Sequence, residues 1–230
     1  MIEKTIITRG SQFYHKNVFF IFLLEAFCTF ENKKMQYPEF YKHVETIKLY
    51  DPLSDFLGAF GDGMVEFSYL DVVKSAGHSC ASMAGAYLIV QTALKELYKE
   101  EIPLRGGIKI FIKGNLEEGV MGVISNAFSQ ITGATDISGF KGIGGRFVRH
   151  SLMEFNADIK GDFKFERTDT CESVELVYQP IPPVAEQQGL MQKILSQQAT
   201  EADKNTFKDL WQDRVRKLLL EHRDDPKVIR

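Results

Sequence analysis

A histidine and a cysteine stand two residues apart in the stretch KSAGHSCASMAGAYL, which runs from Lys74 to Leu88. In an extended turn, residues i and i+2 point to the same side, so the imidazole of His78 and the thiol of Cys80 would share one small space. Ser79 or Ser82 is the expected N-cap of the apolar helix that follows. The positive end of a helix dipole favours a thiolate, so the pair predicts chemistry with a thiolate beside an imidazole.

Two kinds of chemistry fit this pair. His78 and Cys80 can be two ligands of a divalent metal ion such as zinc, which usually takes three or four protein ligands. Cys80 can instead be a catalytic nucleophile or redox thiol that uses His78 as its base. A structural interpretation also stays open, with a small buried thiol and a polar turn residue, because His-x-Cys is a weak pattern. Further ligands are available in His43, His150 and Cys171, but no spacing singles one of them out.

A second candidate is the glycine-rich stretch SGFKGIGGR, from Ser138 to Arg146. It matches neither the phosphate-loop nor the dinucleotide fingerprint, and it follows an expected helix rather than a strand. Its backbone amides, together with Lys141, Arg146 and Arg149, could form a nest for an anion. The sequence favours a tight, irregular crossing of core elements over such a nest.

Charge and cysteine usage exclude several classes of protein. The chain has 230 residues with 28 basic and 31 acidic side chains, so its net charge of −3 gives no footprint for nucleic acid. Its three cysteines, Cys28, Cys80 and Cys171, form no Cys-x-x-Cys pair, which argues against a disulfide framework and a four-cysteine zinc site. We therefore expect a reducing, cytoplasmic location.

The N-terminal residues 1–34 are expected to form an extension outside the core. The apolar run VFFIFLL, from Val18 to Leu24, follows basic residues as in a signal peptide, but Glu25 interrupts it and no cleavage site follows. The run is too short for a membrane span, which needs about 20 apolar residues. Export remains the alternative if residues 1–28 act as a signal, and translation starting at Met35 would make the extension upstream sequence.

The elements that would position these residues follow from the hydrophobic periodicity. The strongest signal is a buried helix over Ser82–Glu100, whose first half is apolar all round. Strands and helices do not alternate strictly, so we predict an α+β fold with a mixed or antiparallel sheet packed against this long helix. The other expected elements are a broken helical pattern over 38–60, a short strand near 64–70, helical turns over 69–75, a strand over 106–114, a helix over 119–131 and a hairpin of 162–167 with 173–179.

Three prolines, Pro180, Pro182 and Pro183, separate an expected core domain, 35–179, from a C-terminal helical appendage, 180–230. The second helix of this appendage should begin at a Thr-x-x-Asp cap near Thr200. It carries an apolar stripe that must cover the core of its own chain or that of a second subunit. We expect a homodimer, because two-fold dimers are the commonest oligomers. The stripe consists of Phe207, Leu210, Trp211, Val215, Leu218 and Leu219.

The segments AGHSCASMAGAYL, GVMGVISNAFSQITGAT, GFKGIGGRF and LWQDRVRKLL together resemble the FmdE family, which is named after a component of formylmethanofuran dehydrogenase. The resemblance runs from about Glu39 to about Leu220 and is strongest from Gly77 to Phe147. Family members share a Gly-His-x-Cys motif that is usually followed by proline, where this chain has Ala81. Some members add a zinc finger built on four cysteines, and we expect none here.

The resemblance implies an α+β core, a homodimer and a metal-binding or active-site pocket at His78 and Cys80 that can take a small molecule. We therefore expect a soluble metal-binding protein, with zinc as the metal and His78 and Cys80 as ligands. The alternatives are a metal-independent thiol enzyme or redox protein that uses Cys80, and a non-catalytic accessory protein. Fold resemblance does not decide whether the protein is an enzyme.

Overall fold

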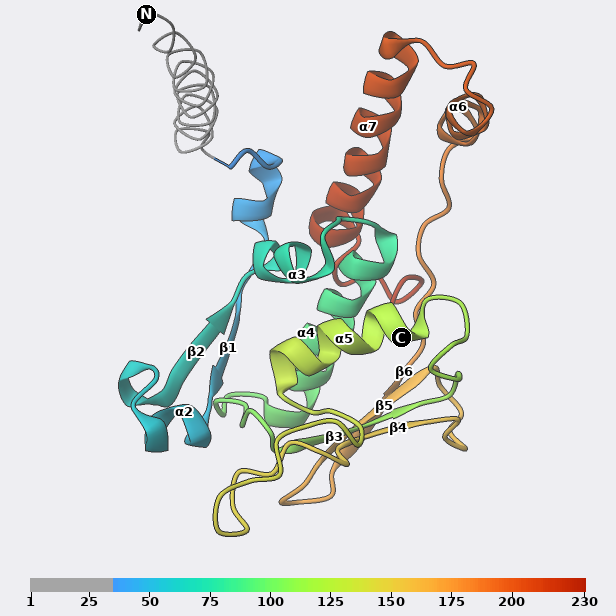
Figure 1. Ribbon diagram of the computed structural model, residues 1–230. Helices are drawn as coiled ribbons and strands as arrows, with labels where there is room; N and C mark the ends of the chain where they lie inside the picture. Colours follow the sequence, from blue (N-terminus) through green and yellow to red (C-terminus); the bar gives the residue numbers. More distant parts are fainter. Residues whose placement is uncertain (1–34) are drawn as a thin grey trace, which may run out of the picture. The chain divides into compact units, whose positions relative to one another are not determined.

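The computed structural model describes residues 35–230, and the expected extension 1–34 lies outside the described residues. The chain divides into two units, residues 1–37 and 38–230, and the second holds all the elements below. It contains one four-stranded mixed sheet, one two-stranded antiparallel sheet and the helices shown in Figure 1. The predicted α+β class is confirmed.

The four-stranded sheet has the strand order β4-β3-β5-β6. Its strands are β3 (Ile108–Ile112), β4 (Met153–Phe155), β5 (Phe163–Arg167) and β6 (Ser173–Leu176). β3 runs parallel to β4 and antiparallel to β5, and β5 and β6 form the expected hairpin. One face is fully buried, and it consists of Ile108, Ile110, Ile112, Phe163 and Phe165.

Two helices cover the buried face of this sheet, α4 (Ala81–Tyr98) and α5 (Met121–Thr132), and they cross each other in Figure 1. Phe128 of α5 packs edge-on against the rings of Phe163 and Phe165. The prediction of a long buried helix is confirmed, because twelve of the residues of α4 are buried. Its small residues serve close packing, since a Cβ on Gly85 would overlap the Tyr178 ring.

The two-stranded sheet pairs β1 (Ile47–Tyr50) with β2 (Met64–Phe67). Between them lie helix α2 (Pro52–Leu57) and a 3-10 turn (Gly61–Gly63), and a further 3-10 turn (Glu39–His43) precedes β1. The helical pattern predicted over 38–60 is therefore wrong at β1. Ile47 and Leu49 are buried while Lys48 is exposed, so the run has the period of two of a strand.

The sequence prediction missed β4, which is only three residues long and follows the glycine-rich loop. A strand this short shows no alternation, and its place depends on pairing with β3 far away in sequence. The other predicted elements are confirmed, including helix α3 (Tyr69–Ala76), which ends immediately before the candidate site.

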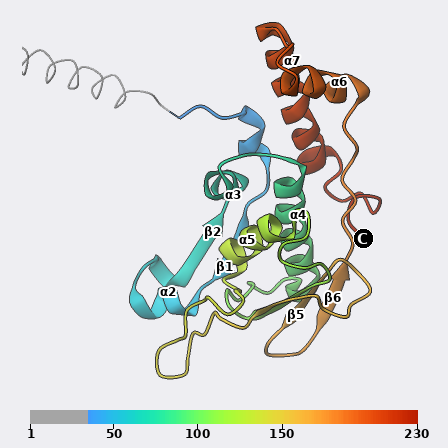
Figure 2. The same ribbon diagram turned by 45° about the vertical axis from the view of Figure 1, so that its right-hand side comes forward.

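The C-terminal region forms helices α6 (Ala185–Leu195) and α7 (Glu201–Arg216), which continues as a π-helical turn, η3 (Lys217–Glu221). α6 and α7 lie side by side, and Thr200 caps α7 with Asp203 as predicted (Figure 2). No helix within residues 35–230 is long and apolar enough to cross a membrane.

The apolar stripe of α7 divides into two halves. Val215, Leu218 and Leu219 are buried, and the η3 turn packs against α4 of the same chain. Phe207, Leu210 and Trp211 are only half-buried, and the Phe207 and Trp211 rings lie 5.4 Å apart. The lower half of the stripe therefore covers its own core, and the homodimer stays a prediction.

Candidate functional site

The His-x-Cys pair lies in the turn that joins α3 to α4. Gly77 ends α3 with a left-handed φ of 74°, which a residue with a side chain would adopt only with strain, and its N–H donates to the Val73 carbonyl. Cys80 has an extended backbone and is the N-cap of α4, although no side chain caps this helix. The expected cap by Ser79 or Ser82 is wrong, because the Ser79 hydroxyl instead pairs with the Tyr69 hydroxyl.

His78 is exposed, and a backbone carbonyl orients its ring. Nδ1 of His78 lies 3.0 Å from the carbonyl oxygen of Ala76. In the neutral imidazole, Nδ1–H donates to this oxygen, and Nε2 keeps its lone pair. Metal-binding histidines are commonly held this way, because the bond fixes both the tautomer and the ring direction.

His78 lines a pocket of about 640 Å³ between α3, the start of α4 and α5. This volume lies within the range of small-molecule sites. Gln130 belongs to the lining, and its amide donates to the Asp71 carbonyl, while its Oε1 has no partner among the described residues. No charged side chain lines the pocket, whose residues are Val72, Ser75, Ala76, His78, Met83, Val123, Asn126, Ala127, Ser129 and Gln130.

Cys80 is half-buried and has different neighbours. It interacts electrostatically with Tyr69, Tyr178 and Arg214 and does not line the His78 pocket. Burial lowers the pKa of Arg214, and negative charge on Tyr178 and Cys80 opposes that shift. A helix N-terminus with a nearby cation is the setting in which protein thiolates occur.

Ser79, between the two candidate residues, is held from several sides. Its carbonyl oxygen accepts from Nε1 of Trp211 at 2.8 Å and from Nε2 of Gln212 at 3.4 Å. Its hydroxyl lies 2.9 Å from the Tyr69 hydroxyl, and the Tyr41 hydroxyl donates to Oε1 of Gln212 at 3.2 Å. Helix α7 thus fixes the backbone of the turn, and the sequence prediction missed this role. The available signal was the single tryptophan of the chain within the apolar stripe.

The structure does not supply further metal ligands beside this turn. Within residues 35–230, no group of three or more His, Cys, Asp and Glu side chains is placed to hold a metal ion. His150 pairs with the neighbouring Ser151 hydroxyl at 2.9 Å, and Cys171 is exposed in the β5–β6 turn. The candidate site within this part of the chain therefore consists of His78 and Cys80.

The glycine-rich loop is a crossing of core elements, as the sequence favoured. Arg149 is buried, and its Nη2 donates to Oδ1 of Asp51 at 2.6 Å, while Nη1 of Arg105 donates to Oδ2 at 2.8 Å. Burial of Asp51 opposes ionisation, but these bonds and charges outweigh it, and its pKa falls below the usual value. Arg146 stacks over the Phe147 ring at 4.8 Å, so neither arginine is committed to an anion nest.

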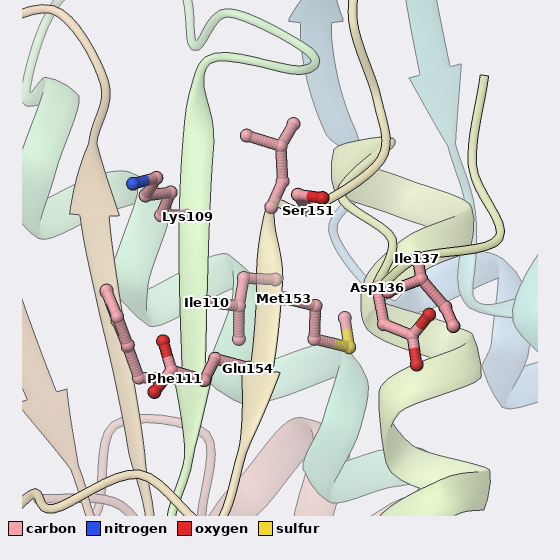
Figure 3. A pocket seen from close by; sticks show the side chains of 9 residues that line it. Lys109, Ile110, Phe111, Asp136, Ile137, Ser151, Met153 and Glu154 are labelled. Atoms are coloured by element: carbon pink, nitrogen blue, oxygen red, sulfur yellow. The ribbon is translucent and has the colours of Figure 1, made fainter. Parts of the chain in front are cut away.

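A smaller pocket of about 210 Å³ lies where β3 and β4 meet the loop at Asp136 (Figure 3). Its lining holds Lys109, Asp136 and Glu154 but neither histidine nor cysteine. It offers no thiol or imidazole, so the turn before α4 remains the candidate site.

Comparison with known proteins does not identify the chain. No family model, no curated protein and no solved structure matches it. The resemblance to the FmdE family therefore stays a prediction from the sequence motifs.

Proposed function

We propose that the protein binds a divalent metal ion of the zinc class through Nε2 of His78 and the thiolate of Cys80. The observation that supports this most is the bond between Nδ1 of His78 and the Ala76 carbonyl, because it leaves Nε2 as the unprotonated nitrogen. Cys80 offers a thiolate at the N-terminus of α4, near Arg214. The imidazole and thiolate form a donor set that zinc prefers.

Two protein ligands leave coordination positions open. Catalytic zinc sites keep an open position for water or substrate, whereas structural sites are closed by four ligands. We propose that a small molecule in the uncharged 640 Å³ pocket completes the coordination next to His78. A bound zinc ion would act there as a Lewis acid. His78 would hold the metal at the pocket, and Asn126, Ser129 and Gln130 would orient the molecule through hydrogen bonds.

The metal proposal is tested by the metal content of protein purified without a histidine tag. We expect near-stoichiometric metal that is lost in both His78→Ala and Cys80→Ser. The matched controls are His150→Ala and Cys171→Ser, which remove the same side chains elsewhere and should leave the metal content unchanged. Cobalt substitution adds a spectral test, because a thiolate-to-cobalt charge-transfer band should be absent from Cys80→Ser. Metal-free wild-type protein that also fails to bind added zinc or cobalt would refute the proposal.

A second candidate is a metal-independent thiol function of Cys80, and the Arg214 neighbourhood favours it. A thiolate at a helix N-terminus is a nucleophile as well as a ligand. Alkylation by iodoacetamide separates the two candidates, with the exposed Cys171 as an internal reference. Faster alkylation of Cys80 than of Cys171 in metal-free protein, unchanged by added zinc, would support the thiol function. Protection of Cys80 by zinc would support the metal site.

The remaining expectations are part of the same proposal. We propose a homodimer in the cytoplasm, supported by the half-exposed upper stripe of α7 and by the sequence resemblance. Light scattering of the purified protein tests the dimer directly.

A further inference from the structure

A charged groove lies at the other end of α4, far along the helix from the His-x-Cys turn. It has a volume of about 270 Å³ and lies between the start of β1, the last turns of α4, the loop that follows and the C-terminal region. Six charged side chains line it: Glu45, Lys48, Lys95, Lys99, Glu101 and Arg223.

The two carboxylates of the groove already have arginine partners. Glu45 pairs with Arg223, and Glu101 accepts from Nη1 of Arg167 at 3.0 Å. Arg167 lies outside the groove and is itself clamped by Asp169 at 2.8 Å. These carboxylates are therefore not free to neutralise the lysines.

Lys48, Lys95 and Lys99 make no ion pair within the described residues. Glu66 lies opposite Lys48 in the β1–β2 register, but its carboxylate accepts a hydrogen bond from Thr46. Three ammonium groups thus border one hollow without a carboxylate partner, in a chain whose net charge is −3. Mutual repulsion of like charges makes this arrangement costly unless an anion joins it.

The helix dipole explains only part of the cluster. Lys95 lies in the last turn of α4, where a cation suits the free carbonyl groups. Lys48 comes from β1, and Lys99 has left the helix with a φ of 53°, which residues other than glycine rarely adopt. Such backbone conformations cluster at ligand-binding positions. Cations from separate segments therefore converge on the groove.

We propose that this groove binds a small polyanion that carries phosphate or carboxylate groups. Lysine ammonium groups bind either kind of oxyanion as point charges, without the planar fork that would select one of them. The apolar part of the lining is small and includes Ile47 and Leu94, which are buried. Charge, rather than apolar contact, is therefore the expected source of affinity. A hollow of about 270 Å³ fits a compact anion rather than a polymer.

Isothermal titration calorimetry of the full chain tests the proposal, with pyrophosphate and citrate as probes and sodium chloride at matched ionic strength as the salt control. We expect saturable 1:1 binding of at least one probe, and the preferred probe distinguishes a phosphate ligand from a polycarboxylate. The double variant K95Q/K99Q should weaken this binding at least tenfold. The double variant K109Q/K141Q removes the same charge from exposed lysines elsewhere and should bind like wild type.

Two results would overturn the proposal. One is the absence of saturable binding of either probe to folded wild-type protein. The other is equal weakening by K95Q/K99Q and K109Q/K141Q, which would show a general charge effect. If K95Q/K99Q fails to fold, the single variant Lys48→Gln replaces it, because its side chain is exposed on β1 and should be dispensable for folding.

Discussion

The two ends of α4 are built on opposite principles. At its N-terminus, the backbone of Ser79 is held by hydrogen bonds from α7, and the adjoining pocket has no charged lining. At its C-terminus, lysines border an open groove, and their side chains lack ion-pair partners within residues 35–230. The first end is suited to fixed geometry, as coordination requires, and the second to attraction by charge. Substitutions should therefore cost stability at the first end and ligand affinity at the second.

The largest expected loss of stability is from Gly85→Ala, in the N-terminal half of α4. A Cβ there would overlap the Tyr178 ring, whose hydroxyl donates to the Ala81 carbonyl at 2.6 Å. Overpacking of this kind costs about 1–3 kcal/mol. The free energy of unfolding in urea measures it.

The matched control is Gly189→Ala in α6, where an added Cβ meets nothing within 4 Å. Replacing glycine by alanine inside an unobstructed helix stabilises by about 0.5–1 kcal/mol. Opposite signs for the two substitutions would confirm the close contact at Gly85. A loss of the same size at both positions would contradict it.

The next effect is that of Trp211→Phe, which removes one donor from the buried turn. The Ser79 carbonyl would keep only the longer bond from Gln212. Leaving such an acceptor poorly satisfied costs about 1–2 kcal/mol of folding stability. If α7 also positions the ligands, zinc affinity should fall several-fold in a competition titration. Unchanged zinc affinity together with lost stability would give Trp211 a structural role only.

This contrast also explains how far the sequence could be interpreted. The His-x-Cys turn was predictable because its residues are adjacent and the helix after it has a strong local pattern. The role of Trp211 was not, because its partner lies 132 residues away in sequence. The groove was missed for the same reason, since it joins β1, α4 and Arg223. Arg149 showed the converse, because a side chain whose type suits an anion nest is instead paired with Asp51 inside the protein.

At the C-terminal end of α4, removing charge should hardly change stability. K95Q/K99Q replaces exposed side chains that make no ion pair within residues 35–230, and such surface substitutions usually stay within about 0.5 kcal/mol. Relief of the repulsion between the lysines makes a slight gain the expected sign. Urea unfolding at low and high salt measures it, and any gain should shrink as salt screens the charges. A loss above about 1 kcal/mol would show that the lysines support the fold.

The smallest signal is optical, and it compares both ends of α4 in one protein. Trp211 is the only tryptophan, and its Nε1–H donates to the Ser79 carbonyl between His78 and Cys80. Zinc at these two residues should therefore shift or quench its emission. Pyrophosphate in the groove should not, because the groove lining contains no residue of the turn or of α7. Equal responses to both ligands would mean that the two ends of α4 are coupled, and their separate treatment would then be wrong.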